Sequence, residues 1–397
     1  MRRYITLLIV AYTLLQAQTV TLDEFIQNVQ QLKLLDKSIK QEADALEAEV
    51  QSDIADEPFV LSHYISKIGT SVDNLKNGID TSLSKEMRLG DIKELEERMY
   101  RLSNESYILS KKEDVIALKN ELLLVYHQYC LGESYLNSYQ NYYSHIKELY
   151  RKKKIAYEHN DIAKTELLQV EFEKDRQNRE LKNLIRKQQN IKETLLALGG
   201  YGLDDSFVCS DLYPIKGDID LDTNELFPIS KEVYKKEQDS IKVGVQRYSK
   251  KLESLNLSLG YNHEVDTDFY TVGVELPLNF TSRKNEYKKA SLLYQYSANE
   301  TKHHLSIKQR ELKLKEVQSQ LKNISQEILG IEDNIRAFQA KLMPLIQKSY
   351  DYGESSVMEY LLTQQKLNIL QRELLDAKER YYKRLFRLYT LSQREDI

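Results

Sequence analysis

The sequence predicts a mainly α-helical chain with long antiparallel coiled coils and two β-hairpins of the kind that cross a membrane. Residues 255–280 alternate apolar and polar side chains with a period of two, which predicts strands with one apolar and one polar face. The 397 residues include only 5 Pro and 13 Gly, and 30% are charged, which favours long helices with few interruptions. The same plan of helices and strands occurs twice along the chain.

The first residues have the composition of a secretory signal peptide. Arg2 and Arg3 precede an apolar run at 4–15, and Ala17 stands at a plausible cleavage site, so residues 1–17 are predicted to be removed. No later segment of the sequence has the roughly 18 consecutive apolar residues of a membrane-spanning helix. The remaining chain carries a net negative charge, so no basic face for nucleic acid is expected.

The hairpin at 255–280 has about ten residues in each arm, which matches a tilted strand that crosses a bilayer. Its polar turn is expected at 266–268. The polar positions of the two arms are expected to share one face, which in a closed barrel lines the lumen. They are Asn256, Ser258, Asn262, Glu264, Glu275 and Asn279. A soluble antiparallel sheet has the same alternation, so the strands alone leave both possibilities open.

An internal repeat predicts the organisation of the first half. Moving the second half back by about 195 residues places Gly273 on Gly78 and Arg283 on Arg88, and one offset that holds across several elements indicates a duplication. The predicted organisation is a first repeat at 18–202, a connector at 203–228 and a second repeat at 229–397. The first hairpin is expected at about 60–86, although its alternation is interrupted by lysines.

Each repeat is predicted to contain a helix, a hairpin, a very long helix, a tight turn and a closing helix. The helices are expected at 22–52, 91–157 and 162–198, and again at 229–251, 283–351 and 357–392, with turns at about 157–162 and 352–357. A helix of about 67 residues is about 100 Å long, and such helices survive by packing as coiled coils. Pro344 is expected to bend the second long helix.

The predicted strands cannot stand alone in a bilayer. Every backbone polar group there needs a partner, so the strands must close into a barrel. Two chains would supply eight strands, whose interior is just filled by side chains, whereas three chains would supply twelve and leave a passage. The polar lumen residues favour a wet interior, so a homotrimer is the smallest assembly that is also a channel.

Several segments together resemble the TolC family of outer-membrane efflux proteins. They are the opening at 19–26, the strand-to-helix segment at 272–283, and the turn and helix at 353–362 with its continuation at 367–377. The resemblance implies a trimer with a twelve-stranded barrel in outer-membrane lipid and a periplasmic α-helical tunnel. It also implies docking with a periplasmic adaptor and an inner-membrane pump of the RND or ABC type, as in tripartite efflux or type I secretion. No catalytic activity, cofactor or metal site is implied.

The family's tunnel narrows at the two helix turns, so the resemblance implies two sets of site residues there. The predicted aperture residues are Asp161, Lys164, Glu354, Ser355 and Glu359. The predicted adaptor-contact residues are Tyr157, Ile162, Tyr352, Gly353 and Val357. With the offset of the repeat, Lys164 matches Glu359 and is expected to pair with one of the acids, while Glu158 takes the place of Gly353. Alternatively, charges at the turns only keep exposed loops soluble.

Other conspicuous residues are interpreted as structural. Cys130 and Cys209 are expected to be buried as small apolar residues rather than bridged, and the basic run at 151–154 is expected to be a solvated helix face. His303 and His304 diverge around a helix and cannot easily share a metal. No nucleophile stands beside a base at a recognisable spacing, so an enzyme is not predicted.

Two alternatives to the channel remain. The first is a secreted coiled-coil structural or adhesion protein with soluble hairpins, and the second is a protein of the same fold that serves as a scaffold without conducting. The sequence does not disclose the exported substrate.

Overall fold

The structure, a computed structural model, describes residues 19–69, 76–219, 221, 225–264, 267–277 and 283–394. The predicted signal peptide, the first residue of the 266–268 turn and the lumen candidate Asn279 lie outside the described residues. The chain forms two compact units. The helical unit comprises Met1–Asp36, Asp114–Leu226 and Arg310–Ile397, and the sheet unit comprises Lys37–Glu113 and Phe227–Gln309. The division therefore differs from the predicted sequence repeats, because each unit takes residues from both halves.

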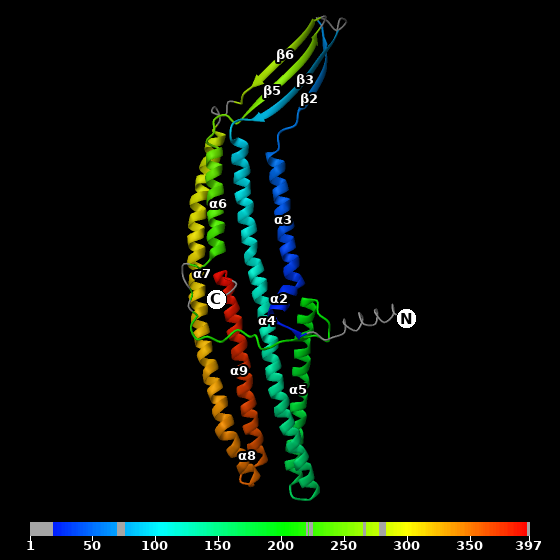
Figure 1. Cartoon of the computed structure of the whole chain (residues 1–397), viewed down its shortest axis with the longest axis vertical. Helices are drawn as coiled ribbons and strands as arrows, with labels where there is room; N and C mark the ends of the chain where they lie inside the picture. Colours follow the sequence, from blue (N-terminus) through cyan, green and yellow to red (C-terminus); the bar gives the residue numbers. More distant parts are fainter. Residues whose placement is uncertain are drawn as a thin grey trace, which may run out of the picture. The chain divides into compact units, whose positions relative to one another are not determined.

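The sheet unit contains the two predicted hairpins. Strands β2 (Val60–Ile68), β3 (Lys76–Arg88), β5 (Ser254–Glu264) and β6 (Thr267–Glu275) form one four-stranded sheet in the order β2-β3-β5-β6. All neighbours are antiparallel, and the strands lie side by side in Figure 1. The first hairpin, which the repeat predicted despite its poor alternation, is thereby confirmed.

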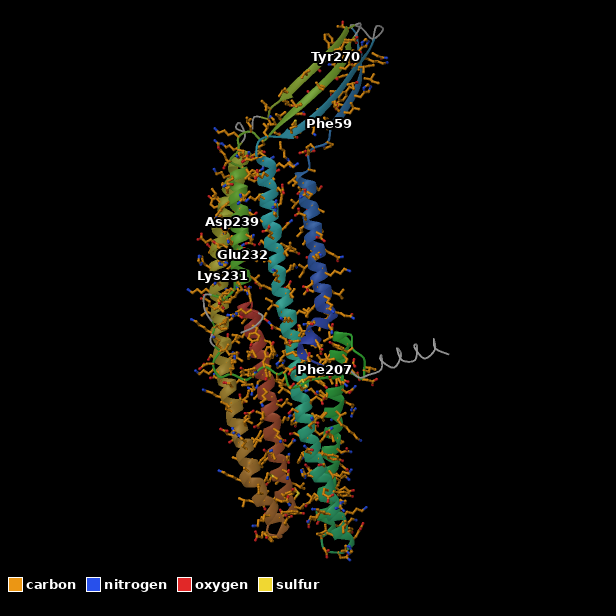
Figure 2. The ribbon with its side chains drawn as sticks, viewed as in Figure 1. Phe59, Phe207, Lys231, Glu232, Asp239 and Tyr270 are labelled. Carbon is orange, nitrogen blue, oxygen red and sulfur yellow. A yellow bond between two sulfur atoms is a disulfide. The ribbon has the colours of Figure 1, made fainter. Side chains whose placement is uncertain are left out.

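The register of the sheet gathers apolar side chains on one face. Residues opposite each other in neighbouring strands point to the same face, and Leu61, Leu83, Leu259 and Val272 form one row across all four strands. Leu259 is 58% exposed and Val272 is 79% exposed. Phe59 and Tyr270, also exposed, lie toward opposite ends of the sheet (Figure 2). A broad apolar surface of this kind indicates an interaction site and not ordinary protein surface.

The helices of the sheet unit meet the strands at a group of ion pairs. The unit contains α6 (Pro228–Arg247) and parts of α3 (Gln30–Ile54), α4 (Ile92–Glu158) and α7 (Lys284–Ala337). Arg247 at the end of α6 lies 2.8 Å from Glu96 of α4 and 3.0 Å from Glu253, which precedes β5. These side chains are less than one-fifth exposed, so the pairs fix the direction in which β5 leaves the helices.

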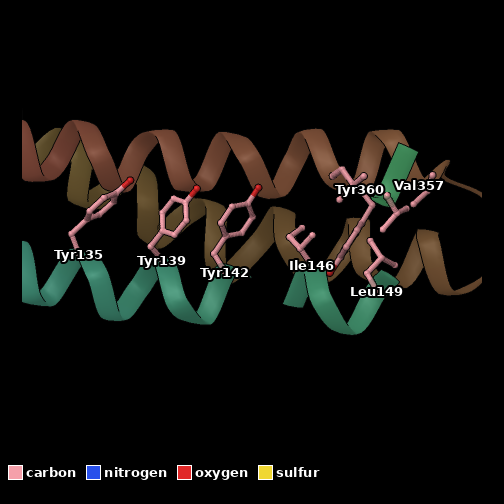
Figure 3. Close-up of a cluster of buried hydrophobic side chains, with 9 residues drawn as sticks. Tyr135, Tyr139, Tyr142, Ile146, Leu149, Val357 and Tyr360 are labelled. Atoms are coloured by element: carbon pink, nitrogen blue, oxygen red, sulfur yellow. The ribbon is translucent and has the colours of Figure 1, made fainter. Parts of the chain in front are cut away.

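The helical unit contains the remainder of α4 and α7 together with α5 (Lys164–Gly199), α8 (Met343–Asp351) and α9 (Val357–Ser392). Its core includes a stripe on α4 made of Tyr135, Tyr139, Tyr142, Ile146 and Leu149. These positions recur every three or four residues and so share one helix face. The tyrosine rings extend from α4 toward α9 (Figure 3). None of the described helices is long and apolar enough to cross a membrane.

Two predicted helices are interrupted. The helix expected at 22–52 is divided into α2 (Leu22–Asn28) and α3, because Val29 leaves the helical conformation at ψ 114°. The helix expected at 283–351 contains a π-helical segment at Phe338–Leu342, directly before α8. Pro344 has no N–H to donate to the preceding turn. The missing hydrogen bond explains the widened turn, which lies next to the residue at which the sequence predicted a bend.

The connector packs against the helical unit and is bonded to it by a disulfide. The expectation that the two cysteines are buried without a bridge is wrong. Cys130 of α4 and Cys209 form a disulfide. Just before Cys209, β4 (Ser206–Phe207) pairs in parallel with β1 (Thr19–Val20). The Tyr126 hydroxyl donates to the Val208 carbonyl at 2.5 Å. The connector is therefore part of the packed core, and its packing against α4 brings Cys209 next to Cys130.

A neutral histidine holds the next part of the connector. His127 is fully buried among the rings of Tyr213, Tyr382 and Phe386. The Tyr213 backbone N–H donates to its Nε2 at 3.0 Å, and its Nδ1 lies 2.8 Å from the Leu123 carbonyl. Because a backbone N–H can only donate, Nε2 must be unprotonated and Nδ1 must carry the hydrogen. Burial lowers the pKa of His127 to about 4, although the hydrogen bond to Leu123 opposes the shift.

Candidate functional site at the helix turns and the sheet faces

The first turn of the helical unit joins α4 to α5 through residues 159–163. Asn160 adopts the left-handed conformation at φ 60°. The Asn160 N–H donates to the Tyr157 carbonyl at 3.0 Å, and the Asp161 N–H donates to the Ala156 carbonyl at 2.8 Å. This pattern is that of a Schellman motif, which satisfies the last carbonyls of a helix. It projects Asp161 into solvent just beyond the end of α4.

The second turn joins α8 to α9 and has the same geometry. Gly353 adopts the left-handed conformation at φ 73°. Its N–H donates to the Tyr350 carbonyl at 3.0 Å, and the Glu354 N–H donates to the Ser349 carbonyl at 2.9 Å. Glu354 is exposed. Each turn therefore places one carboxylate directly after its left-handed residue.

The shared geometry corrects the residue equivalence predicted from the repeat. At the turns Asn160 matches Gly353, and Asp161 matches Glu354, an offset two residues smaller than in the strands. Glu158, the last residue of α4, therefore does not take the place of the glycine. Asparagine tolerates the left-handed region better than most residues, so the first turn needs no glycine.

Lys164 and Glu359 are likewise not equivalent. Glu166 and Glu359 both lie in the first turn of their helices, α5 and α9, where a negative charge is favourable. The Ser356 hydroxyl caps α9 by accepting a hydrogen bond from the Glu359 N–H at 3.1 Å. At the second turn the Ser349 and Ser355 hydroxyl oxygens lie 2.7 Å apart, which holds that loop against α8.

Within this chain, the lysine that pairs with an acid near the turns is Lys153. Within the described part of this chain, Lys164 forms no ion pair with the predicted acids. Lys153 of α4 lies 2.5 Å from Glu166 of α5 and 5.0 Å from the ring centre of Tyr350 of α8. Tyr350 stacks on Tyr360 of α9 at 5.0 Å. One cation thus connects α4 to α5 and to α8.

The environment of Lys153 corrects the expectation that the whole run at 151–154 is solvated. Its side chain is only 17% exposed. Burial lowers the pKa of Lys153, but hydrogen bonding to Glu166 and Tyr350 outweighs burial and raises the pKa overall. Lys153 continues the buried stripe of Ile146 and Leu149 at helical spacing, and this signal was present in the sequence.

The structure divides the predicted adaptor-contact residues. Tyr352 is 71% exposed, Tyr157 is exposed and Ile162 is partly buried. Val357 is only 5% exposed and packs in the core with Tyr360. Its side chain therefore supports the second turn from inside and offers no contact surface in this chain.

The described lumen candidates share one face of the sheet. The strand register places Asn256, Ser258, Asn262, Glu264 and Glu275 on the face opposite the apolar rows. The Asn256 amide donates to the Glu275 carboxylate at 3.4 Å. The pairing of β3 with β5 adds polar residues that the sequence analysis did not name. They are Asp80, Ser82, Ser84 and Glu86.

In the part of the chain that the structure describes, the sheet has two unpaired edges, and the helical unit has two turns of matching geometry. Among the described strands, β2 pairs only with β3 and β6 only with β5, so both edges of the sheet are open for other strands. The two helix turns match in geometry, and they join α4 to α5 and α8 to α9.

Comparison with solved structures identifies this fold. The chain is similar to the outer membrane protein VceC of Vibrio cholerae, with a TM-score of 0.70 and 12% identity over 94% of this chain and 95% of that one. It is similar to the outer membrane channel CmeC of Campylobacter jejuni, with a TM-score of 0.66 and 14% identity over 93% and 84%. The open state of the outer membrane channel MtrE of Neisseria gonorrhoeae gives a TM-score of 0.67 and 10% identity over 94% and 88%.

Sequence comparison finds no match among protein-family models or curated proteins. The likeness to solved structures establishes the fold. The chain has the fold of outer-membrane channels, and the fold class predicted through the TolC resemblance is confirmed.

Proposed function

We propose that this chain is the outer-membrane channel of a tripartite efflux or type I secretion system, with a large periplasmic helical part. The observation that carries the proposal is the sheet. One of its faces is apolar and exposed, the other is polar, and β2 and β6 are open edges. Such a sheet is unstable alone in water, whereas a closed barrel buries the edges and turns the apolar face to lipid.

Three copies are the smallest number that gives a conducting barrel. Twelve strands leave a passage, whereas eight are filled by side chains. The edge strands of each copy would then pair with those of its two neighbours, and the polar face would line the lumen. The pairing of every strand edge therefore requires a closed ring of copies, and the need for an open passage sets their number at three.

The matched turns supply the narrow end of the duct. Asp161 and Glu354 occupy equivalent, exposed positions, and three-fold symmetry would bring several carboxylates together. A ring of carboxylates attracts cations and repels anions. The aperture is therefore expected to select for cations, and the neighbouring exposed Tyr157 and Tyr352 are candidates for contact with a periplasmic adaptor.

The disulfide supports an extracytoplasmic location. Bridges such as Cys130–Cys209 form and persist in oxidising compartments, including the bacterial periplasm. The duct itself performs no chemistry and needs no cofactor. An inner-membrane pump of the RND or ABC type would drive the substrate, and the duct would conduct it passively.

The first experiment measures the mass of the protein extracted from outer membranes in mild detergent, and then its conductance in a planar bilayer. We expect a trimer with discrete, cation-selective channels. The double variant Asp161→Asn and Glu354→Gln should lose most of the cation preference. The control Asp204→Asn removes an exposed carboxylate in the connector and should leave the preference unchanged.

Other outcomes distinguish the alternatives. A monomer or dimer without conductance would refute the channel and support a secreted coiled-coil structural or adhesion protein. A trimer that inserts into the bilayer but never conducts would support a scaffold. Equal selectivity of the double variant and the wild type would reject the carboxylates as the aperture.

A further inference from the structure

Lys85 interrupts the apolar face of the sheet near the end at which the strands join the helices. The strand register places it in one row with Leu257 and Val274. Its amine lies 4.7 Å from the centre of the ring of Phe59, the residue that directly precedes β2. A cation on an apolar face is costly unless it meets water or a countercharge, so the position of Lys85 requires an explanation.

The described residues supply no countercharge for Lys85. Among them Lys85 forms no ion pair and no hydrogen bond, and the adjacent Glu86 points to the opposite, polar face of the sheet. The Lys85 side chain is partly buried, but its amine is not one of the polar atoms that the protein encloses without a partner. The positive charge is therefore accessible to an anion from outside the chain.

A depression in the apolar face lies at this lysine. Its volume is about 440 Å³, which is within the range of pockets that hold small organic ligands. Among the described residues, Lys85 is the one charged side chain of its lining. Most of the other lining residues are apolar, namely Phe59, Leu83, Met87, Leu257, Leu259 and Val272. An apolar depression with one cation in its wall suits an amphiphile that has a negative headgroup and a hydrocarbon tail.

The position of Lys85 along β3 agrees with the depth of lipid headgroups. Leu89, four residues later, donates its N–H to the carbonyl of Glu253 at 2.9 Å, and Glu253 belongs to the ion pairs at which the helices of the sheet unit meet the strands. Four residues of a strand span about 14 Å, and less along the bilayer normal because barrel strands are tilted. The lysine stem can carry its amine over part of this distance. Lys85 can thus place its charge at the boundary between hydrocarbon and headgroups, where a cation costs much less than at the bilayer centre.

We propose that this depression binds an anionic phospholipid, with the phosphate at the Lys85 amine and an acyl chain against Leu83, Leu259 and Val272. The inference rests on the proposed function, because a barrel in a membrane is what turns this face to lipid. The lipid belongs to the periplasmic leaflet, since the site lies at the helix end of the sheet. A zwitterionic phospholipid carries the same phosphate together with a cation, so the lysine favours lipids with a net negative charge.

A fluorescent reporter at the site tests the proposal. The chain contains no Trp, so Phe59→Trp introduces a single fluorophore in each copy and keeps an aromatic face for the amine. The full-length Phe59→Trp protein is reconstituted at pH 8 into phosphatidylcholine vesicles that contain a small fraction of brominated phosphatidylglycerol or of brominated phosphatidylcholine. Bromine quenches a fluorophore that it contacts. We expect the phosphatidylglycerol to give equal quenching at about one-fifth of the mole fraction, the effect of one lysine on an anionic lipid.

Substitutions in the Phe59→Trp protein assign the preference to one residue. Lys85→Met keeps the unbranched stem but removes the charge and should abolish the preference, whereas Lys85→Arg should retain it. Lys302→Met removes an exposed lysine of α7 and should change nothing. The matched reporter is Tyr270→Trp in the otherwise wild-type chain, because Tyr270 is exposed on the same face and lies toward the opposite end of the sheet (Figure 2). Both brominated lipids should quench that reporter equally.

The proposal is overturned if the two lipids quench the Phe59→Trp protein equally, or if Lys85→Met retains the preference. An equal preference at the Tyr270→Trp reporter would also overturn it, because the attraction would then belong to the whole barrel. Equal quenching together with normal conductance in a planar bilayer would reject the lipid site and leave the channel intact. If neither lipid quenches either reporter, the apolar face does not contact lipid, and both this inference and the proposed barrel fail.

Discussion

Lowering the pH should release the connector from His127. The imidazole is fully buried, and its pKa in the folded protein is about 4, against an ordinary value of 6.5. The unfolded segment therefore binds a proton more readily than the folded one, and stability rises with pH between these two values. The contribution of His127 is fully present above pH 6.5 and is lost as the pH falls toward 4.

The size of the effect follows from the two pKa values. At pH 4.5 a histidine that titrates at 6.5 when released and at 4 when buried destabilises the folded segment by about 2.5 kcal/mol relative to neutral pH. This equals about a 70-fold increase in the population of the opened connector. Protonated Nε2 cannot accept the Tyr213 N–H, so the opening should include that amide.

Hydrogen exchange measured by mass spectrometry on the peptide around Tyr213 tests this prediction. Protection, corrected for the intrinsic exchange rate at each pH, should fall about 70-fold between pH 7 and pH 4.5. His127→Gln cannot titrate in this range, so its protection should depend much less on pH. The reasoning is refuted if wild type and variant lose protection equally, because the acid sensitivity would then arise from other groups.

Three further predictions concern stability. Cys130→Ala opens a loop with a sequence separation of 79 and should cost about 4 kcal/mol in denaturant unfolding, and reductant should lower the wild type to the same level. Gly353→Ala should cost about 1 kcal/mol through backbone strain alone, since no atom lies near an added Cβ. Asn160→Gly at the equivalent position should cost less, and hydrogen exchange of the turn amides compares the two. Lys153→Met should loosen both turns by about 1 kcal/mol in the same measurement, whereas the exposed Lys152→Met should not, and equal effects would contradict the role of Lys153.

The elements of this fold were predictable because their signals can be read from the sequence without knowledge of tertiary contacts. Alternation located β5 and β6, and the repeat located β2 and β3 despite Lys67 and Lys85. The bridge between Cys130 and Cys209 was not predictable, since nothing in their spacing indicates Cα atoms 5.2 Å apart. That distance depends on how the connector packs against α4.

The turns show why the candidate site was predicted less accurately than the fold. The acids Asp161 and Glu354 were named, but their equivalence was hidden by a shift of two residues, and the left-handed role of Asn160 was not recognised. Lys153 looked like a surface charge because its partners come from α5 and α8. Tertiary packing determines which residues Lys153 contacts, whereas its spacing from Ile146 and Leu149 was a usable sequence signal that it lies on the buried face.

The open edges of the sheet have a consequence for how this protein folds and evolves. If β6 of one copy must pair with β2 of another, the barrel has no native state at the level of the single chain, and its stability depends on protein concentration. A substitution on β6 then affects its pairing with a strand that lies about two hundred residues earlier in the sequence and belongs to a different molecule. In such an assembly, each chain would expose two unpaired edge strands until the ring closed, and these strands could pair with a wrong partner.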